Sequence, residues 1–226
     1  RYISQLLANL GVLSTASGTI SDLFDVPDAK AVFIDLRPFV NMGFKDDEQA
    51  NGKGGWSDQG INDMRYFPTG RQRFQGVPFD VIVPEQNDGK AVITWTYLSE
   101  EQRQKVEGGF PVGRKLKRLF ILHSSAWTPP AADLAEYTVT YEDGTQERFK
   151  AASPLHLHDW WRPYSVKDPG AGIAWVGRLA YPGAPQVAMF MMSWVNPHPE
   201  KEIKTVTLKA LHGFYILAGM TGELPD

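Results

Sequence analysis

The sequence predicts an all-β fold, an antiparallel β-sandwich of the jelly-roll kind. About ten short runs rich in Val, Ile, Phe, Tyr, Trp and Thr are each bounded by Gly, Pro, Asn or Asp, as strands and their turns are. No long helical pattern separates these runs, so parallel strand–helix–strand units are not expected. The pair Asp143-Gly144, within TVTYEDGTQERF, is typical of a tight hairpin turn. Together these observations favour antiparallel strands in two packed sheets.

The order of the expected elements separates an N-terminal segment from a β domain. Residues 3–13 place leucine and isoleucine at helical spacing, and small residues follow them. We therefore expect a short N-terminal helical extension with a linker over residues 1–30 and one β-sandwich domain over residues 31–226. The strands are expected at residues 32–36, 74–83, 91–97, 118–123, 136–141, 146–150, 173–181, 187–194, 203–209 and 214–219.

Length and composition limit the classes of protein. With 226 residues the chain is long enough for one large β domain. Its net charge of −3 gives no basic field, so no nucleic-acid partner is expected. No apolar run is long enough for a membrane-spanning helix, so no membrane role is expected. Cysteine is absent, which excludes disulfides and thiol catalysis.

A long segment without strand or helix pattern, residues 41–70, interrupts the β domain. It reads NMGFKDDEQANGKGGWSDQGINDMRYFPTG, in which Gly, Asn and Asp surround a single Trp56. Loops of this length in a compact domain are usually functional or disordered. Strand-like runs flank the segment on both sides, so we expect it to be anchored and ordered. We interpret it as a structured loop that faces a ligand.

This loop combines an aromatic ring with planar polar side chains. An indole stacks on the apolar face of a sugar, and carboxylate, amide and guanidinium groups bind sugar hydroxyls. The candidate binding residues in the loop are Trp56, Asp58, Gln59, Asn62, Asp63 and Arg65. Asp58 and Asn62 also suit turns in which they bond the loop's own backbone, and Trp56 also suits a position on the sandwich core.

Two further tryptophans are candidate platforms for a sugar. Trp127 ends the strand-like run FILHSSAW before a Pro-rich segment, where it either meets a ligand or closes the end of the core. Trp161 follows Trp160, and adjacent residues of a strand face opposite sides, so one ring can enter the core while the other is exposed. Trp127 and Trp161 therefore join the predicted ligand-binding residues.

Several segments together resemble a known family of modules. They are IDLRPFVNMGFKDD, GKGGWSDQGINDMRYFPTGRQRFQGVPFDVI, KRLFILHSSAW, YEDGT and NPHPEKEIKTVTL. Over residues 31–222 the chain resembles galactose-binding-like β-sandwich modules of the carbohydrate-binding-module type, which accompany bacterial polysaccharide-degrading enzymes. The resemblance implies a noncatalytic module whose loops bind a polysaccharide or oligosaccharide, or a structural calcium. It also implies a secreted, periplasmic or cell-surface bacterial protein with a neighbouring catalytic domain.

Two groups of residues are candidate metal ligands. Calcium prefers carboxylate and carbonyl oxygens, and Asp46 and Asp47, with Asp58, lie in a glycine-rich loop that can wrap an ion; a solvated acidic loop is the alternative. In LHLHDWWRPY, an extended chain puts His156 and His158 on one face, as two ligands of a transition metal. The alternative is that both histidines bond backbone or solvent.

One basic run also has two interpretations. It contains Arg103, Lys105, Arg114, Lys115, Lys117 and Arg118. It can contact an acidic polysaccharide or a phosphate backbone. We favour the other interpretation, a sheet edge whose charges prevent edge-to-edge pairing, because Pro111 and Gly113 divide the cluster.

The function predicted from the sequence is therefore noncatalytic glycan binding, and two alternatives remain. One is a β-jelly-roll polysaccharide lyase or glycoside hydrolase; the common hydrolase and nucleotide signatures are absent, but acidic residues are numerous enough that some pair will have catalytic spacing by chance. The other is a scaffold or interaction domain of a larger protein, whose aromatic residues pack against a neighbour.

Overall fold

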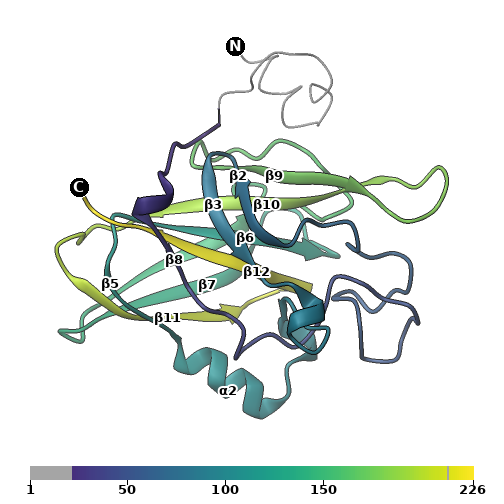
Figure 1. The fold of residues 1–226 in the computed structure, drawn as a ribbon, viewed down its shortest axis with the longest axis horizontal. Coiled ribbons are helices and arrows are strands. Elements are labelled where there is room, and N and C mark those ends of the chain that lie inside the picture. The colour runs from purple at the N-terminus through teal and green to yellow at the C-terminus, as the bar shows by residue number, and fades with distance from the viewer. Residues whose placement is uncertain (1–21, 213) are drawn as a thin grey trace.

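Two antiparallel sheets face each other in the computed structural model, which describes residues 22–212 and 214–226 (Figure 1). The strands of the first sheet are β1 (Ala31–Phe33), β4 (Ile93–Thr94), β6 (Arg118–Ala126), β9 (Ala171–Arg178), β10 (Gln186–Val195) and β12 (Phe214–Glu223). The strands of the second sheet are β5 (Phe110–Lys115), β7 (Ala132–Tyr141), β8 (Gln146–Ser153) and β11 (Glu202–Ala210). A separate hairpin joins β2 (Gly70–Phe74) to β3 (Val77–Val81).

The connections between the two sheets are those of a jelly roll. In the first sheet β4 pairs with β12, which is followed by β6 and β10. The second sheet has the order β5-β11-β7-β8. From β4 onward the chain passes from one sheet to the other at every connection except the β7–β8 and β9–β10 hairpins, as in a sandwich of two Greek keys. The predicted all-β sandwich is confirmed.

The core lies between the sheets and continues over the outer face of the first sheet. On β7, Tyr137, Val139 and Tyr141 are buried and alternate with partly exposed residues, as expected of a strand with one face toward the core. On β6, every residue after Arg118 is buried. The reason is that the β2–β3 hairpin covers the other face of this sheet, in front of β12 in Figure 1. Thr221 Oγ1 on β12 donates a hydrogen bond to the Pro78 carbonyl at 2.9 Å and so ties the hairpin down.

A buried polar chain crosses the core between the two sheets. His123 Nδ1 on β6 lies 2.6 Å from the Tyr215 hydroxyl on β12, and that hydroxyl lies 2.8 Å from the Tyr137 hydroxyl on β7. All three side chains are fully buried. Burial, with a smaller contribution from the neighbouring His156, lowers the pKa of His123 to about 3, so the imidazole is neutral in the folded state.

Three elements differ from the sequence prediction. A nine-residue helix, α2 (Glu100–Gly108), precedes β5, and neither element was expected. The run at residues 74–83 is not a single strand, because the turn at Gln75-Gly76 divides it into the end of β2 and all of β3.

The predicted hairpin at Asp143-Gly144 is confirmed. It joins β7 to β8, and Gly144 has φ of 82°.

The predicted N-terminal helix at residues 3–13 lies outside the described residues. From residue 22 onward the chain packs on the sandwich. The Phe24 and Val26 N–H groups donate to the Gln75 and Gly76 carbonyls, both at 3.1 Å. Val26 is buried, and a short 3-10 turn, Asp28–Lys30, leads into β1. Within the described part of the chain, no helix has the length and apolar character that crossing a membrane requires.

Candidate functional site

The loop of residues 41–70 is held together by its own charged side chains. Asp63 is buried, and its Oδ2 accepts a hydrogen bond from the Asp46 N–H at 2.7 Å. Arg65 Nη2 lies 2.7 Å from Asp63 Oδ2 and donates to the Asp46 carbonyl at 2.7 Å. The hydrogen bond with Asp63 raises the pKa of Arg65. Contrary to prediction, Asp63 does not present its carboxylate to a ligand, because the ion pair with Arg65 is part of the loop's framework.

The predicted calcium ligands also serve the loop. Asp46 is buried, its Oδ1 accepts from the Glu48 N–H at 3.2 Å, and its Oδ2 accepts from the Gly60 N–H at 2.8 Å. Burial raises the pKa of Asp46, and these two N–H groups oppose the rise. Asp47 pairs with Lys45 at 2.8 Å. Across the described residues no group of three or more His, Asp or Glu side chains is placed to hold a metal ion, so the geometry does not support the predicted site.

Trp56 lies in the core and not at the rim, which corrects the central prediction for this loop. Its side chain has 0% exposure, and its ring meets the Trp160 ring edge-on at 4.9 Å between centroids. The loop can carry the indole inward because its backbone packs closely on itself: the Trp56 N–H donates to the Gly43 carbonyl at 2.9 Å. A Cβ at Gly43 would lie only 2.3 Å from the Gly89 carbonyl oxygen, so only glycine fits there. Trp56 therefore cannot stack on a sugar.

Trp127 is the tryptophan that faces solvent beside this loop. It is 54% exposed and follows the last residue of β6. Its ring lies 4.5 Å from the Phe214 ring at the start of β12, and Phe214 in turn meets Tyr97 at 5.6 Å, edge-on. These three rings come from separate parts of the sequence that the fold brings to one end of the sandwich. They form an aromatic wall next to the loop.

A hollow of about 310 Å³ separates this wall from the loop. We call it the Trp127 groove, and its lining residues are Gln49, Ala50, Ser57, Asp58, Gln59, Asn62, Tyr97, Trp127 and Phe214. Three residues predicted from the loop, Asp58, Gln59 and Asn62, therefore meet the predicted Trp127 in one place. Tyr97 and Phe214 were missed as site residues; each lies at one end of a predicted strand, and that position is the only signal the sequence offers.

The polar side chains of the groove differ in how many hydrogen bonds they already make within the protein. Both oxygens of Asp58 accept backbone hydrogen bonds, from Asn51 and Gly52, at 3.0 Å each. Tyr97 also reaches Asp58 Oδ2, at 3.5 Å, and burial followed by this carboxylate raises the pKa of Tyr97. The Asn62 amide oxygen accepts a hydrogen bond from the Tyr181 hydroxyl at 3.3 Å, so the Asn62 NH₂ group is left to donate to a ligand. Among the described residues, the Gln59 side chain makes no hydrogen bond, so its whole amide is available to a ligand.

The remaining predicted residues lie away from this groove. Trp161 is partly buried, with its ring edge-on to Trp160 at 5.0 Å, so one ring of the pair is in the core and the other is partly exposed. His156 Nδ1 accepts from the Ala152 N–H at 3.0 Å, and His158 Nε2 lies 3.3 Å from the Ser165 carbonyl. Each histidine therefore bonds the backbone, as in the alternative to metal binding.

The basic run is divided among several elements. Arg114 and Lys115 lie on β5, which is an edge strand of the second sheet, as the edge interpretation requires. Arg103 and Lys105 belong to α2. Arg118 begins β6 and pairs with Glu223 at 3.3 Å. These residues are therefore spread over α2, β5 and the start of β6.

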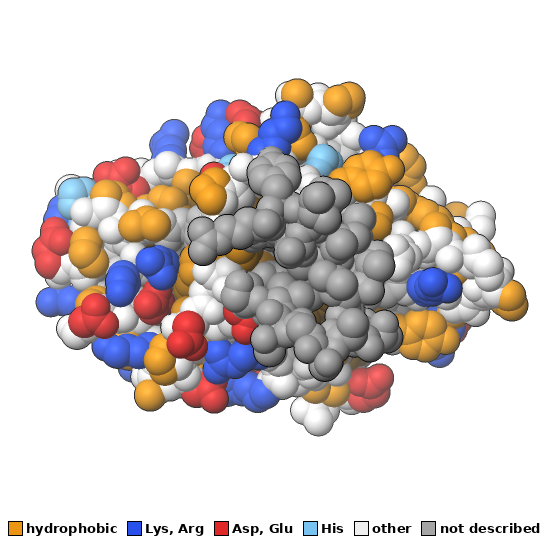
Figure 2. All heavy atoms as spheres, turned by 90° about the horizontal axis from the view of Figure 1, so that it is seen from above, with side chains coloured by type: hydrophobic (Ala, Val, Ile, Leu, Met, Phe, Trp, Pro, Cys, Tyr) orange, Lys and Arg blue, Asp and Glu red, His pale blue; other side chains and the backbone are white. Residues whose placement is uncertain are grey.

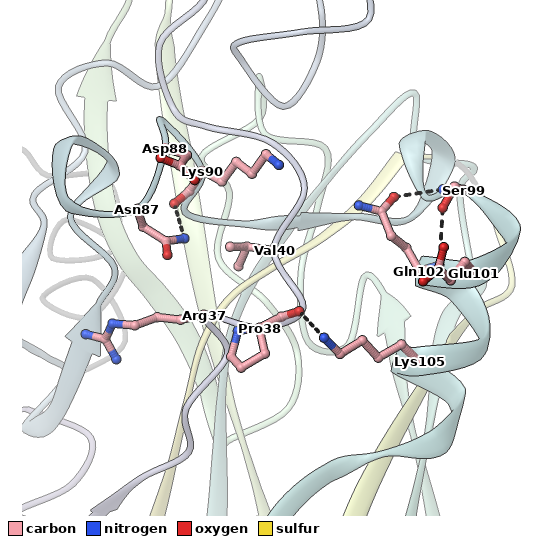
Figure 3. A pocket seen from close by; sticks show the side chains of 10 residues that line it. All are labelled: Arg37, Pro38, Val40, Asn87, Asp88, Lys90, Ser99, Glu101, Gln102 and Lys105. Carbon is pink, nitrogen blue, oxygen red and sulfur yellow. Dashed lines mark hydrogen bonds between the residues drawn. The ribbon is translucent and has the colours of Figure 1, made fainter.

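A larger hollow lies elsewhere and lacks the features of the groove. Its volume is about 600 Å³, and the segments that line it include the start of α2 (Figure 3). Two of its three cations are already engaged: Arg37 pairs with Asp80 at 3.1 Å, and Lys105 Nζ donates to the Pro38 carbonyl at 2.9 Å. It contains no aromatic side chain. Its larger volume alone therefore does not make this hollow the better candidate for a ligand site.

Figure 2 shows the charges on one face of the molecule. Lys and Arg side chains lie beside Asp and Glu side chains, mainly in the half drawn on the left, and hydrophobic side chains lie among them. On the described residues of this face the two signs of charge are therefore mixed.

Comparisons with known proteins assign no family to this geometry. No protein-family model matches the chain, and a search of curated proteins finds no matching sequence. The resemblance to carbohydrate-binding modules therefore stays a prediction from the sequence.

Proposed function

We propose that the protein is a noncatalytic carbohydrate-binding module that holds a polysaccharide or oligosaccharide in the Trp127 groove. The observation that carries this proposal is the exposed ring of Trp127 opposite the amides of Gln59 and Asn62. The indole supplies an apolar platform for the face of a sugar, and the amides bind hydroxyls at its edge. Ligand sites in proteins commonly combine such apolar walls with a few polar groups.

The backbone at Trp127 supports a binding role. Its φ is 50°, in the left-handed region that bulky residues rarely adopt, which costs on the order of 1–3 kcal/mol. The bend that follows is fixed: the Thr128 N–H donates to Asp159 at 3.1 Å, and the Thr128 hydroxyl donates to Ser125 at 3.0 Å. A strained backbone held in place, with a large apolar ring turned toward water, is typical of a ligand-binding position.

Binding of a single sugar in this groove is expected to be weak. One stacked ring contributes about 1 kcal/mol beyond the burial of its area. Retention on a polymer then comes from repeated contacts, through several modules or through an attached glycan-degrading enzyme on the same polymer.

Replacing Trp127 by alanine tests the proposal. We expect Trp127→Ala to weaken polysaccharide binding about tenfold, because the platform for the sugar face is lost. The matched control is Tyr66→Ala, which removes a ring that is 62% exposed and does not line the groove. Binding is measured by isothermal titration calorimetry against soluble plant and algal polysaccharides.

Two results would contradict the proposal. The first is that folded wild-type protein binds none of the polysaccharides, or that both variants lose affinity equally. The second is that incubation releases reducing ends or unsaturated products, which would indicate a hydrolase or lyase.

A further inference from the structure

A second hollow lies beside the segment that follows Trp127. It has a volume of about 320 Å³ and is lined by segment 128–131 and by parts of residues 153–167. Trp127 lines the groove and Thr128, the next residue, lines this second hollow, so the two are adjacent along the chain. The Trp127–Thr128 segment therefore borders both hollows.

Unpaired positive charge distinguishes this second hollow. Arg162 and Lys167 both line it, both are exposed, and neither side chain forms an ion pair or hydrogen bond within the described part of the chain. Many other cations of the protein are engaged, such as Arg65 with Asp63 and Lys201 with Asp143. We call this site the cationic hollow.

The two cations face a common space next to His158. Arg162, Lys167 and His158 all line the hollow. Burial lowers the pKa of His158, the hydrogen bond to the Ser165 carbonyl opposes this change, and the charges of Arg162 and Lys167 act in the same direction as burial. His158 is in contact with Tyr164, whose ring centroid lies 5.9 Å away and whose side chain is 56% exposed. Two cations next to an exposed ring are the groups that recognise a charged sugar.

The one carboxylate in the cationic hollow is already used by the protein. Asp159 Oδ2 accepts from the Thr128 N–H at 3.1 Å, and Oδ1 accepts from the Trp161 N–H at 3.0 Å. Asp159 thus joins the two walls of the hollow and does not pair with Arg162 or Lys167 among the described contacts. The positive charge in the hollow is left for a ligand.

We propose that the cationic hollow binds an acidic group, a carboxylate or a sulfate, on the glycan that occupies the Trp127 groove. The inference rests on the proposed function and specifies its substrate class as acidic polysaccharide. Arg162 and Lys167 bind the anion, and Tyr164 packs on the sugar that carries it.

The experiment compares polymers that share a backbone and differ in charge. The first pair of probes is soluble oligogalacturonate and its fully methyl-esterified form. The second pair is a soluble oligomer of a sulfated galactan and its desulfated form. The first pair tests a carboxylate as the source of charge and the second pair a sulfate. Calorimetry measures binding to wild-type protein and to the Arg162→Gln/Lys167→Gln variant. The matched control is Arg114→Gln/Lys115→Gln, which removes two positive charges on β5.

We expect wild-type protein to bind the acidic member of at least one pair about tenfold more tightly than its neutral form. The Arg162→Gln/Lys167→Gln variant should lose this preference and keep its affinity for the neutral form, and the control should retain both. Equal binding of acidic and neutral forms, or equal losses in the two double variants, would overturn the inference and leave the proposed function standing. If wild-type protein binds none of the probes, the inference is overturned as well, and the wider set of plant and algal polysaccharides then decides the proposed function.

Discussion

The Trp56→Ala variant should lose about 3–5 kcal/mol of unfolding free energy, the usual cost of removing a large buried aromatic side chain. Trp56 has no exposed surface and packs edge-on against Trp160, so the substitution leaves a cavity where the loop of residues 41–70 joins the sandwich. Urea unfolding followed by far-ultraviolet circular dichroism measures the change.

The control is the same substitution at the other tryptophan. Trp127 is 54% exposed, so Trp127→Ala should change the unfolding free energy by less than about 1 kcal/mol. The two variants thereby separate a tryptophan that stabilises the fold from one that is proposed to contact a ligand. A Trp56→Ala protein as stable as the wild type would show that the indole is not part of the core.

Acidification should destabilise the protein through His123. The folded-state pKa of about 3 lies below the ordinary value of 6.5, because burial disfavours the charged imidazole. Below pH 6.5 the unfolded chain therefore binds a proton that the folded chain does not, and stability falls as the pH falls from 6.5 toward 3. Between pH 7.5 and pH 5 this one group should remove about 2 kcal/mol of unfolding free energy.

A neutral substitution isolates the contribution of His123. Urea unfolding of wild-type protein and His123→Gln at pH 7.5, 6 and 5 should show that the variant loses about 2 kcal/mol less than the wild type over this range. Burial also lowers the pKa values of His156 and His158, so some acid sensitivity remains in the variant. Staying at or above pH 5 limits the contribution of carboxyl groups. Parallel pH profiles for the two proteins would mean that His123 is not buried and neutral.

The strands were predictable because their signal is local. Alternating burial along β7 and the Asp143-Gly144 turn follow from neighbouring residues alone. Helix α2 was missed because it buries only Val106 and so shows no apolar stripe. Its start did carry a local signal, since Ser99 and Gln102 form a capping box.

The assignment of the loop's side chains was not predictable in the same way. Whether Trp56 or Trp127 faces solvent depends on Trp160, a partner far along the chain that no local pattern reveals. Asp63 and Arg65 read equally well as ligand-binding groups and as an internal ion pair, and only the folded loop decides between these roles. Of the predicted residues, Asp58, Gln59, Asn62 and Trp127 do meet in one groove, whereas Trp56, expected to be the main exposed ring, is buried.

Titration of the indole N–H signals in a two-dimensional ¹H–¹⁵N NMR spectrum tests the central claim most directly. The protein has 7 tryptophans, and their indole signals can be assigned by single substitutions to phenylalanine. Adding a bound oligosaccharide should shift the Trp127 signal and leave the buried Trp56 and Trp160 signals in place. A shift at Trp56 with none at Trp127 would contradict the account.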